Sequence, residues 1–409
     1  MNVFKIILNY TRSCAMLKLP LPAIKRIEAL VQSDPDAISF AQGALRVGGV
    51  DPKIRQYAQE VLKTDQADYY QSVIGIMPLR KLIAEQLSAE HNCHITPDHV
   101  MVSHGSVGAI MAFCLTVLEV GDEVLLPNPT YPVYQNTVKA AKATPVFVNA
   151  YQENKNSFSF NLDAIKKATT ERTKLIMFSN PSNPLGYTVT KAELEELIAW
   201  CHDKGIYLLL DEVYDLYIFE AQYQSITPYV TTSPFVLRAS SFSKNFAMSG
   251  WRIGYMLAAP ELVAAMAPVQ DAILCCPNVL AQHAAIYALE HPEIAHTSIE
   301  KVKKSREIAL RLLAPLCEAG IISYHKPQAG FYLFIKTNLK DTTDLVFDIL
   351  NTVKVGLIPG KDFGPDGASY LRLCYAREPE LVTKGVGRLV EYLTNANLLK
   401  NQNKVAATV

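Results

Sequence analysis

Lys244 is the residue of this chain whose surroundings most clearly suit covalent chemistry. It lies in the run Ser240-Ser241-Phe242-Ser243-Lys244-Asn245-Phe246, and Arg252 follows in Gly250-Trp251-Arg252-Ile253-Gly254-Tyr255. A lysine amine can condense with an aldehyde as a Schiff base, while hydroxyls and a guanidinium can bind a phosphate dianion. The pattern therefore favours a ligand that carries both an aldehyde and a phosphate. The alternative is a surface lysine in a serine-rich loop.

Asp211 is the second residue that indicates a site. It ends the apolar run Ile206-Tyr207-Leu208-Leu209-Leu210, so we expect it to be partly buried. A buried carboxylate needs a cation or good hydrogen bonds, and a protonated pyridine nitrogen would serve, with its pKa raised by the carboxylate. Tyr214 follows closely and could present its hydroxyl to the same ring. The alternative for Asp211 is a helix cap or a turn residue.

Two loops add polar groups to this set. The segment Asn180-Pro181-Ser182-Asn183-Pro184-Leu185-Gly186 predicts a rigid turn, with a cis bond before Pro184 and the Asn183 amide directed at a phenolate oxygen. Gly105-Ser106-Val107 precedes an apolar helix, whose first amides could bind phosphate. An ordinary turn and a common strand–helix loop are the respective alternatives.

The hydrophobic pattern predicts the elements that position these residues. Apolar runs are typical of buried strands, and they occur at 100–102, 123–126, 145–148, 174–178, 206–210, 235–238 and 253–257. Segments 78–91 and 190–200 have helical patterns; Thr190 and Glu193 have the spacing of a capping box, and Gly205 suits the end of that helix. The strand–helix–strand order over 174–211 predicts parallel strands covered on both faces.

The predicted sheet would bring the candidate residues together. Gly105, Asn183, Asp211 and Lys244 each follow a different predicted strand. Open parallel sheets bind ligands beyond the carboxyl ends of their strands. The sequence therefore predicts one site at this edge of the sheet, built from four separate loops.

Composition excludes several classes of partner. The 409 residues are 49% hydrophobic and carry 39 basic and 39 acidic side chains, which gives no charge excess for nucleic acid or a membrane surface. Eight cysteines are scattered without metal-type spacing, which is typical of a reduced, cytoplasmic protein. The apolar start of the chain is too short for a membrane span, and we expect residues 1–15 to form an arm or to precede the true start near Met16.

Taken together, these motifs resemble the class I and II aminotransferase family, which are pyridoxal phosphate enzymes of fold type I. Asn-Pro-x-Asn-Pro-x-Gly, Asp-Glu-x-Tyr, Ser-x-Ser-Lys, Gly-Trp-Arg-x-Gly and Leu-Arg-Leu occur here in the family's order, and the resemblance runs from about Ile38 to about Val390. It implies an α/β fold with a large, mostly parallel seven-stranded sheet covered by helices, and a smaller α+β domain. We expect an N-terminal arm and part of the small domain over 1–45, the cofactor-binding domain over 46–290 and the small domain over 291–409.

The resemblance also implies the roles of individual residues. Lys244 would form the internal Schiff base, Asp211 would pair with the pyridine nitrogen, and Asn183 and Tyr214 would contact the 3-oxygen of the ring. The phosphate would be bound by Gly105, Ser106, Val107, Ser241 and Arg252. Tyr131 matches the aromatic residue that stacks on the ring, and Tyr70 matches a tyrosine that reaches the phosphate of the neighbouring subunit, which implies a homodimer with shared sites.

The substrate side of the site is less regular. Arg372 in Tyr370-Leu371-Arg372-Leu373 matches the arginine that binds the substrate α-carboxylate, and Gly43 matches a glycine near the same group. The loop after it, Ala44-Leu45-Arg46-Val47-Gly48-Gly49, departs from the family pattern, as do His104 and Val107. Arg46 could receive a distal carboxylate, although a solvated loop arginine is the favoured interpretation.

The expected activity is transfer of an amino group between an L-amino acid and a 2-oxo acid by a ping-pong mechanism. The first alternative is another pyridoxal phosphate reaction on the same fold, such as β-elimination, aminocyclopropane carboxylate synthesis or oxidation. The second is an aminotransferase-like sensor domain of a transcription regulator, which the short stretch before the family region makes improbable. Cofactor motifs do not identify the amino donor or acceptor.

Overall fold

A seven-stranded sheet forms the centre of the larger part of the molecule. The structure is a computed structural model that describes residues 23–154 and 157–406, and the expectation for residues 1–15 lies outside them. The strands lie in the order β2 (Val100–Ser103), β10 (Gly254–Leu257), β9 (Val236–Ser241), β8 (Tyr207–Asp211), β7 (Thr173–Ser179), β3 (Glu123–Pro127) and β4 (Thr144–Val148). Only β10 is antiparallel to its neighbours. The predicted mostly parallel sheet is therefore confirmed.

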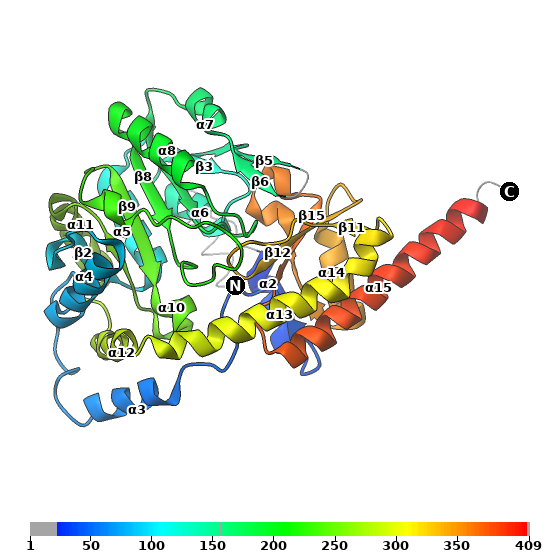
Figure 1. The fold of residues 1–409 in the computed structure, drawn as a ribbon, viewed down its shortest axis with the longest axis horizontal. Coiled ribbons are helices and arrows are strands. Elements are labelled where there is room, and N and C mark those ends of the chain that lie inside the picture. Colours follow the sequence, from blue (N-terminus) through cyan, green and yellow to red (C-terminus); the bar gives the residue numbers. More distant parts are fainter. Residues whose placement is uncertain (1–22, 155–156, 407–409) are drawn as a thin grey trace, which may run out of the picture.

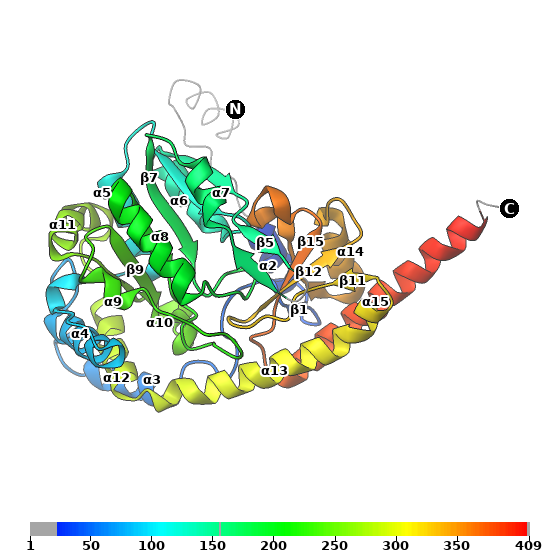
Figure 2. The same ribbon diagram turned by 45° about the horizontal axis from the view of Figure 1, so that its top comes forward.

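Helices cover both faces of this sheet because alternate residues of each strand point to opposite sides. On β8, Leu209 contributes to one hydrophobic cluster and Leu208 and Leu210 to the other. The first cluster is completed by α5 (Gly105–Val117), α6 (Pro132–Ala140) and α11 (Pro260–Leu274). The second is completed by α4 (Met77–His91), α7 (Leu162–Ala168), α8 (Lys191–Lys204) and α12 (Val279–Glu290). Figures 1 and 2 show these helices around the sheet.

The start and end of α8 show how local sequence sets an element. Thr190 Oγ1 accepts from the Glu193 N–H at 3.3 Å, and Glu193 Oε2 accepts from the Thr190 N–H at 2.8 Å. Gly205 ends the helix in the left-handed conformation, with φ of 63°. The predicted capping box and glycine stop are confirmed, and they place β8, with Asp211 as its last residue, directly after the helix.

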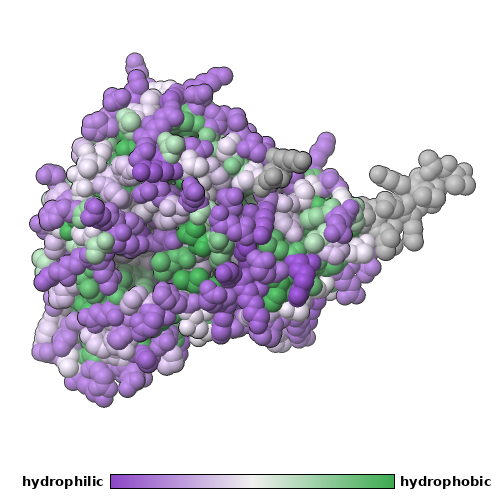
Figure 3. All heavy atoms as spheres, in the orientation of Figure 1, coloured by the Kyte–Doolittle hydropathy of each residue, from purple (hydrophilic) through white to green (hydrophobic). Residues whose placement is uncertain are grey.

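A second, antiparallel sheet lies at the other end of the molecule. Its order is β11 (Ile322–Ser323), β12 (Tyr332–Thr337), β15 (Tyr370–Cys374) and β14 (Ile358–Pro359). The long helix α13 (Glu293–Glu318) packs against α15 (Pro379–Ala406), and α14 (Thr343–Val353) lies beside them (Figures 1 and 2). The face in Figure 3 is mostly hydrophilic, with hydrophobic side chains beside a central hollow.

The first described residues pack with this second sheet rather than with the first. Strand β1 (Ile38–Ser39) pairs in parallel with β13 (Val355–Gly356), and α2 (Ala23–Gln32) packs against β13 and β14. We therefore propose that residues up to 45 join residues 291–409 in the smaller domain, and that 46–290 form the larger one. Further short elements are α3 (Pro52–Val61), α9 (Thr227–Val230), α10 (Phe242–Asn245) and the hairpin β5 (Tyr151–Glu153) and β6 (Phe158–Phe160).

Candidate active site

One cavity of about 720 Å³ collects nearly all the predicted site residues. It lies at the carboxyl ends of the parallel strands, where β2, β7, β8 and β9 lead into their loops, and β15 and α2 close its other side. The predicted residues that line it are Gly43, Gly105, Ser106, Val107, Tyr131, Asn183, Asp211, Tyr214, Ser241, Lys244, Arg252 and Arg372. The four loops therefore converge as the strand pattern predicted.

Lys244 lies on α10, a single helical turn that directly follows β9, rather than in an open loop. Ser241 caps this turn by accepting from the Ser243 N–H at 3.1 Å. The Lys244 amine donates to the Gly43 carbonyl across the cavity, and the Lys244 carbonyl accepts from the Tyr217 hydroxyl at 2.9 Å. Burial lowers the pKa of Lys244 to about 8, although Cys374 and Asp211 oppose the shift. The amine is therefore about half neutral near pH 8 and largely neutral only above that pH.

Asp211 is a buried carboxylate with one oxygen in use. Its side chain is 3% exposed, and Oδ2 accepts from the Tyr134 hydroxyl at 2.8 Å. Oδ1 accepts no hydrogen bond of ordinary geometry from the described residues. Burial raises the pKa of Asp211 to about 6, while Tyr134 and Lys244 lower it. The Val213 N–H also lowers the pKa of this carboxyl, but Oδ1 has no well-formed hydrogen bond, and a buried oxygen in that state beside a cavity favours a cationic or donor partner from a ligand.

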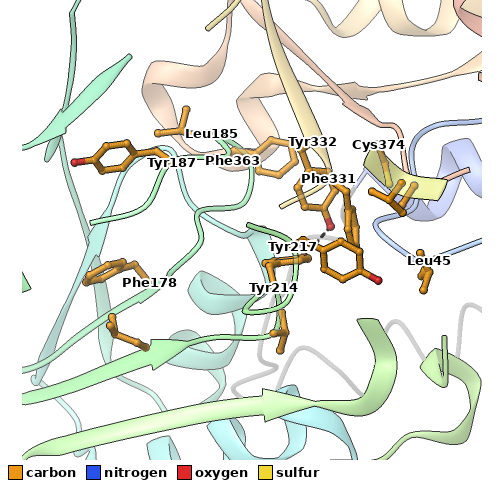
Figure 4. Close-up of a cluster of buried hydrophobic side chains, with 14 of the residues drawn as sticks. Leu45, Phe178, Leu185, Tyr187, Tyr214, Tyr217, Phe331, Tyr332, Phe363 and Cys374 are labelled. Carbon is orange, nitrogen blue, oxygen red and sulfur yellow. Dashed lines mark hydrogen bonds between the residues drawn. The ribbon is translucent and has the colours of Figure 1, made fainter. Parts of the chain in front are cut away.

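Tyr214 belongs to a set of hydroxyl and amide groups that also line the cavity. Its hydroxyl lies 2.8 Å from the Tyr332 hydroxyl and 3.4 Å from Asn183 Nδ2. Figure 4 shows Tyr214 and Tyr332 directed toward each other from the two domains. Burial, and then Tyr332, holds the pKa of Tyr214 well above its usual range, so the phenol keeps its proton. The Asn183–Pro184 bond is cis, as predicted.

The turn from β2 into α5 forms an anion-binding corner with Arg252. Gly105 begins α5 with φ of +73°, and a Cβ there would lie 2.7 Å from Arg252 Nη2. Arg252 Nη2 donates to the His104 carbonyl at 3.2 Å, and Nη1 donates to the Ser249 carbonyl at 2.8 Å. The guanidinium thus lies over the first amides of a 13-residue helix, where a phosphate would gain both charge and N–H donors.

Arg372 is buried on the middle of β15 and directs its guanidinium into the cavity. It is 2% exposed and lies between the Tyr332 and Phe363 rings, at 4.5 and 4.9 Å from their centres. Nη1 donates to Asn183 Oδ1 at 3.1 Å and Nη2 donates to the Ala41 carbonyl, whereas Nε has no hydrogen bond among the described residues. Arg372 is therefore not a surface arginine on an edge strand, because β15 pairs with strands on both sides.

A buried ion network connects the two catalytic candidates. Arg238 on β9 pairs with Glu212 at 2.9 Å and with Asp215 at 2.5 Å, and Asp215 Oδ1 accepts from Asn245 Nδ2 at 3.0 Å. Glu212 follows Asp211 and Asn245 follows Lys244 in the chain. The network therefore holds the end of β8 and the turn α10 in a fixed relation.

Two residues with predicted or considered roles lie outside the cavity lining. Tyr70 is 84% exposed and does not reach the cavity of its own chain. Arg46 is also exposed; it donates to Gln42 and lies 3.7 Å from Glu28, in agreement with a solvated loop arginine. Sequence reasoning missed Tyr134 and Tyr332, which contact Asp211 and Tyr214. Neither tyrosine lies in a motif, so only the fold reveals them.

Other kinds of site find no support in the described part of the chain. Residues 23–154 and 157–406 contain no group of three or more His, Cys, Asp or Glu side chains that could hold a metal ion. Within the same ranges, no helix is long and apolar enough to cross a bilayer. The seven described cysteines are all free.

Comparison with known proteins agrees with this geometry. Residues 35–389 match the family described as Aminotransferase class I and II. The chain is 30% identical over 349 residues to an aspartate aminotransferase of Sulfolobus acidocaldarius, covering 83% of this chain and 86% of the relative. It is 31% identical over 352 residues to aromatic-amino-acid aminotransferase 2 of Thermococcus litoralis, covering 85% and 89%.

Solved structures give the same result. The aromatic aminotransferase of Pyrococcus horikoshii superposes with a TM-score of 0.82 at 28% identity, covering 91% of this chain and 100% of that one. The Thermus thermophilus aspartate aminotransferase solved with maleate gives 0.83 at 26%, covering 91% and 97%. The chain therefore belongs to the class I and II aminotransferase family and is an amino-acid aminotransferase of fold type I.

Proposed function

We propose that this aminotransferase binds pyridoxal 5'-phosphate through Lys244 and works by two alternating half-reactions. The observation that carries the proposal is that the Lys244 amine, the unpaired Asp211 oxygen and the unpaired Arg372 Nε belong to one cavity. These groups match an aldehyde, a protonated ring nitrogen and a substrate carboxylate, respectively.

The residues present fit this cofactor at each of its polar groups. Asp211 Oδ1 would accept from the ring nitrogen, and Asn183 and Tyr214 would donate to the ring oxygen. Ser241, Arg252 and the amides of Ser106 and Val107 would hold the phosphate, with Tyr131 against the ring. When bound, the cofactor supplies an aldehyde that condenses with amines and a ring that accepts the electrons of a bond broken at Cα.

Lys244 supplies the proton transfer in this proposal. In the protein alone, burial lowers the pKa of this amine to about 8. Once released by the incoming amino group, such an amine could take a proton from Cα and return it to a neighbouring carbon. The Gly43 carbonyl accepts a hydrogen bond from this amine and limits its position. The centre of the Tyr214 ring lies 5.9 Å from the amine.

Arg372 orients the substrate in this proposal. The Tyr332 and Phe363 rings and the Asn183 bond fix its guanidinium, which leaves Nε and part of the terminal nitrogens for a bidentate carboxylate. Gly43 lies beside the same group, and a Cβ there would come within 2.2 Å of the Tyr332 hydroxyl. Glycine at this position therefore keeps the carboxylate end of the cavity open.

We also propose a cytoplasmic homodimer with shared active sites, whose other partners are its amino acid and 2-oxo acid substrates. Tyr70 supports the dimer, because a tyrosine 84% exposed beside an exposed Tyr69 is suited to contact a second copy. It would reach the phosphate of the partner. Free cysteines throughout the described residues agree with a reducing compartment.

A single half-reaction tests the proposed chemistry. Holoenzyme mixed with an amino acid alone should form about one equivalent of 2-oxo acid per site and then stop, and adding a different 2-oxo acid should restart the enzyme. The products are measured by chromatography of the quenched mixture. Continuous release of ammonia without an acceptor would indicate elimination or oxidation and would contradict the proposal.

A further inference from the structure

The part of the cavity formed by α2 and by residues 358–363 supplies none of the proposed cofactor contacts. Ile24, Glu28, Ala29 and Gln32 of α2 line it, together with Ile358 and Asp362. The proposed cofactor contacts come from the large domain, and Arg372 and Gly43 serve the α-carboxylate. The α2 side is therefore the part of the cavity that remains for the side chain of the substrate.

The buried cationic side chains of the cavity already have proposed ligands, namely the cofactor and the substrate α-carboxylate. Among the described residues that line it, the lysines and arginines are Lys25, Lys244, Arg252 and Arg372. The last three bind the cofactor or the α-carboxylate in the proposed function. Lys25 lines the cavity on the same side of α2 as Glu28, but it is exposed, so water and salt screen its charge. Among the described residues that line the cavity, no further buried cation is available to pair with a second substrate carboxylate.

Two carboxylates occupy the α2 side instead. Asp362 Oδ2 accepts from the Ala23 N–H at 2.8 Å, and its other oxygen has no hydrogen bond from the described residues. Burial raises the pKa of Asp362, while Lys361 and Arg372 lower it, so the Arg372 charge reaches this carboxyl. Glu28 is 9% exposed and accepts from Ser39 Oγ and from the Gln42 N–H at 3.2 Å. The nearest cation to it is the half-exposed Arg46, whose Nη2 lies 3.7 Å from Glu28 Oε2.

We propose that this enzyme prefers amino acids with an ammonium or guanidinium side chain over dicarboxylic ones, and that Glu28 and Asp362 determine this specificity. A second carboxylate on the α2 side would meet like charges in a partly desolvated space, whereas a cation would find hydrogen-bond acceptors. The proposal rests on the proposed function. The segment around Tyr70, which the proposed dimer offers to its partner, carries Asp65 and Asp68 and no lysine or arginine over residues 64–76.

Half-reaction rates give the first test. Holoenzyme is mixed with lysine, ornithine, arginine, aspartate or glutamate, and kcat/KM is measured from formation of the 2-oxo acid. We expect the basic amino acids to exceed the dicarboxylic ones by about tenfold or more, as expected for a like-charge contact in a partly buried site. Glutamate or aspartate reacting as fast as the basic amino acids would overturn the inference and leave the proposed function intact. Failure of all of these, together with an aromatic and an aliphatic amino acid tested beside them, would instead overturn the proposed function.

A binding comparison tests the charge preference without turnover. Glutarate and 4-guanidinobutyrate share a carboxylate and a three-carbon spacer, differ in the distal charge and carry no reactive amine. Titration calorimetry of the holoenzyme should show tighter binding of 4-guanidinobutyrate. The double variant Glu28→Gln, Asp362→Asn should reduce this preference by about tenfold, whereas Glu300→Gln, on the exposed face of α13, should leave it unchanged. Tighter binding of glutarate, or a preference unaltered in the double variant, would overturn the proposal.

Discussion

At the scale of single residues, Asp211 shows how burial prepares a side chain for a charged partner. Its carboxylate is 3% exposed and has one bonded and one unpaired oxygen, and its pKa is raised to about 6 mainly by burial. A protonated ring nitrogen would stabilise the ionised form and lower this pKa again. Binding of the cofactor and ionisation of Asp211 should therefore be coupled.

This coupling predicts a pH dependence of cofactor affinity. As pH falls through about 6, free Asp211 takes up a proton, and the charge that pairs with the ring nitrogen is lost. The Kd of pyridoxal phosphate, measured by fluorescence titration of apoenzyme, should therefore rise as the pH is lowered below about 6. Asp211→Asn serves as the control for titration of the cofactor itself. A ratio of the two Kd values that stays constant between about pH 5 and pH 8 would contradict the assigned pairing.

Residues in motifs could be predicted from the sequence, whereas their supports could not. Lys244, Asp211 and Arg372 each lie in or after an apolar strand pattern, and the structure places all three in one cavity. Tyr134 and Tyr332 approach Asp211 and Tyr214 from other elements, and their positions depend on how α6 and β12 pack. Nothing in the local sequence of either tyrosine indicates a partner about 80 or more residues away.

At the scale of elements, the antiparallel strand β10 brings Arg252 to the start of α5. The sequence predicted a strand over 253–257 but not its direction, because direction depends on pairing with the distant strands β2 and β9. A Cβ on Gly254, the first residue of β10, would lie 2.7 Å from the Ser106 nitrogen. This close packing sets Arg252 over the helix that would bind the phosphate.

Gly105 gives a prediction at the same scale, with a matched control. Both Gly105 and Gly121 have positive φ, but a Cβ meets Arg252 at 2.7 Å only at Gly105 and meets nothing within 4 Å at Gly121. Alanine at either position should cost about 1 kcal/mol of stability in urea unfolding. Only Gly105→Ala should also weaken binding of pyridoxal phosphate. Equal cofactor affinity in the two variants would show that this corner does not hold the phosphate.

At the scale of the whole molecule, the cavity depends on two domains and, in our proposal, on two chains. Tyr214 and Tyr332 meet across the two sheets, and β1 and α2 bring the first described residues to the same cavity. The domain packing was expected only from resemblance, since no pattern within α2 or β1 identifies β13 as their partner. Tyr70 is exposed and does not line the cavity of its own chain, so its proposed role requires the second chain.

Subunit mixing tests the shared site. Tyr70→Phe would remove only one hydrogen bond to the phosphate, so the more severe substitution Tyr70→Ala is used. Mixed dimers are assembled from one subunit with Tyr70→Ala and one subunit with Lys244→Ala. A mixed dimer contains one site with both residues intact and should recover up to about half of the wild-type activity per dimer. The two homodimers are the controls. Absence of any recovery, with mixing confirmed by native mass spectrometry, would place Tyr70 outside the partner site.

Covalent fixation shows directly whether Lys244 binds the cofactor. Borohydride treatment of holoenzyme attaches pyridoxal phosphate to the lysine that it is bound to, and peptide mass spectrometry locates the modification. We predict a single modified peptide that contains Lys244, and none in Lys244→Ala treated in the same way. Modification of another lysine, or an unmodified Lys244 in holoenzyme that turns over, would show that Lys244 does not bind the cofactor.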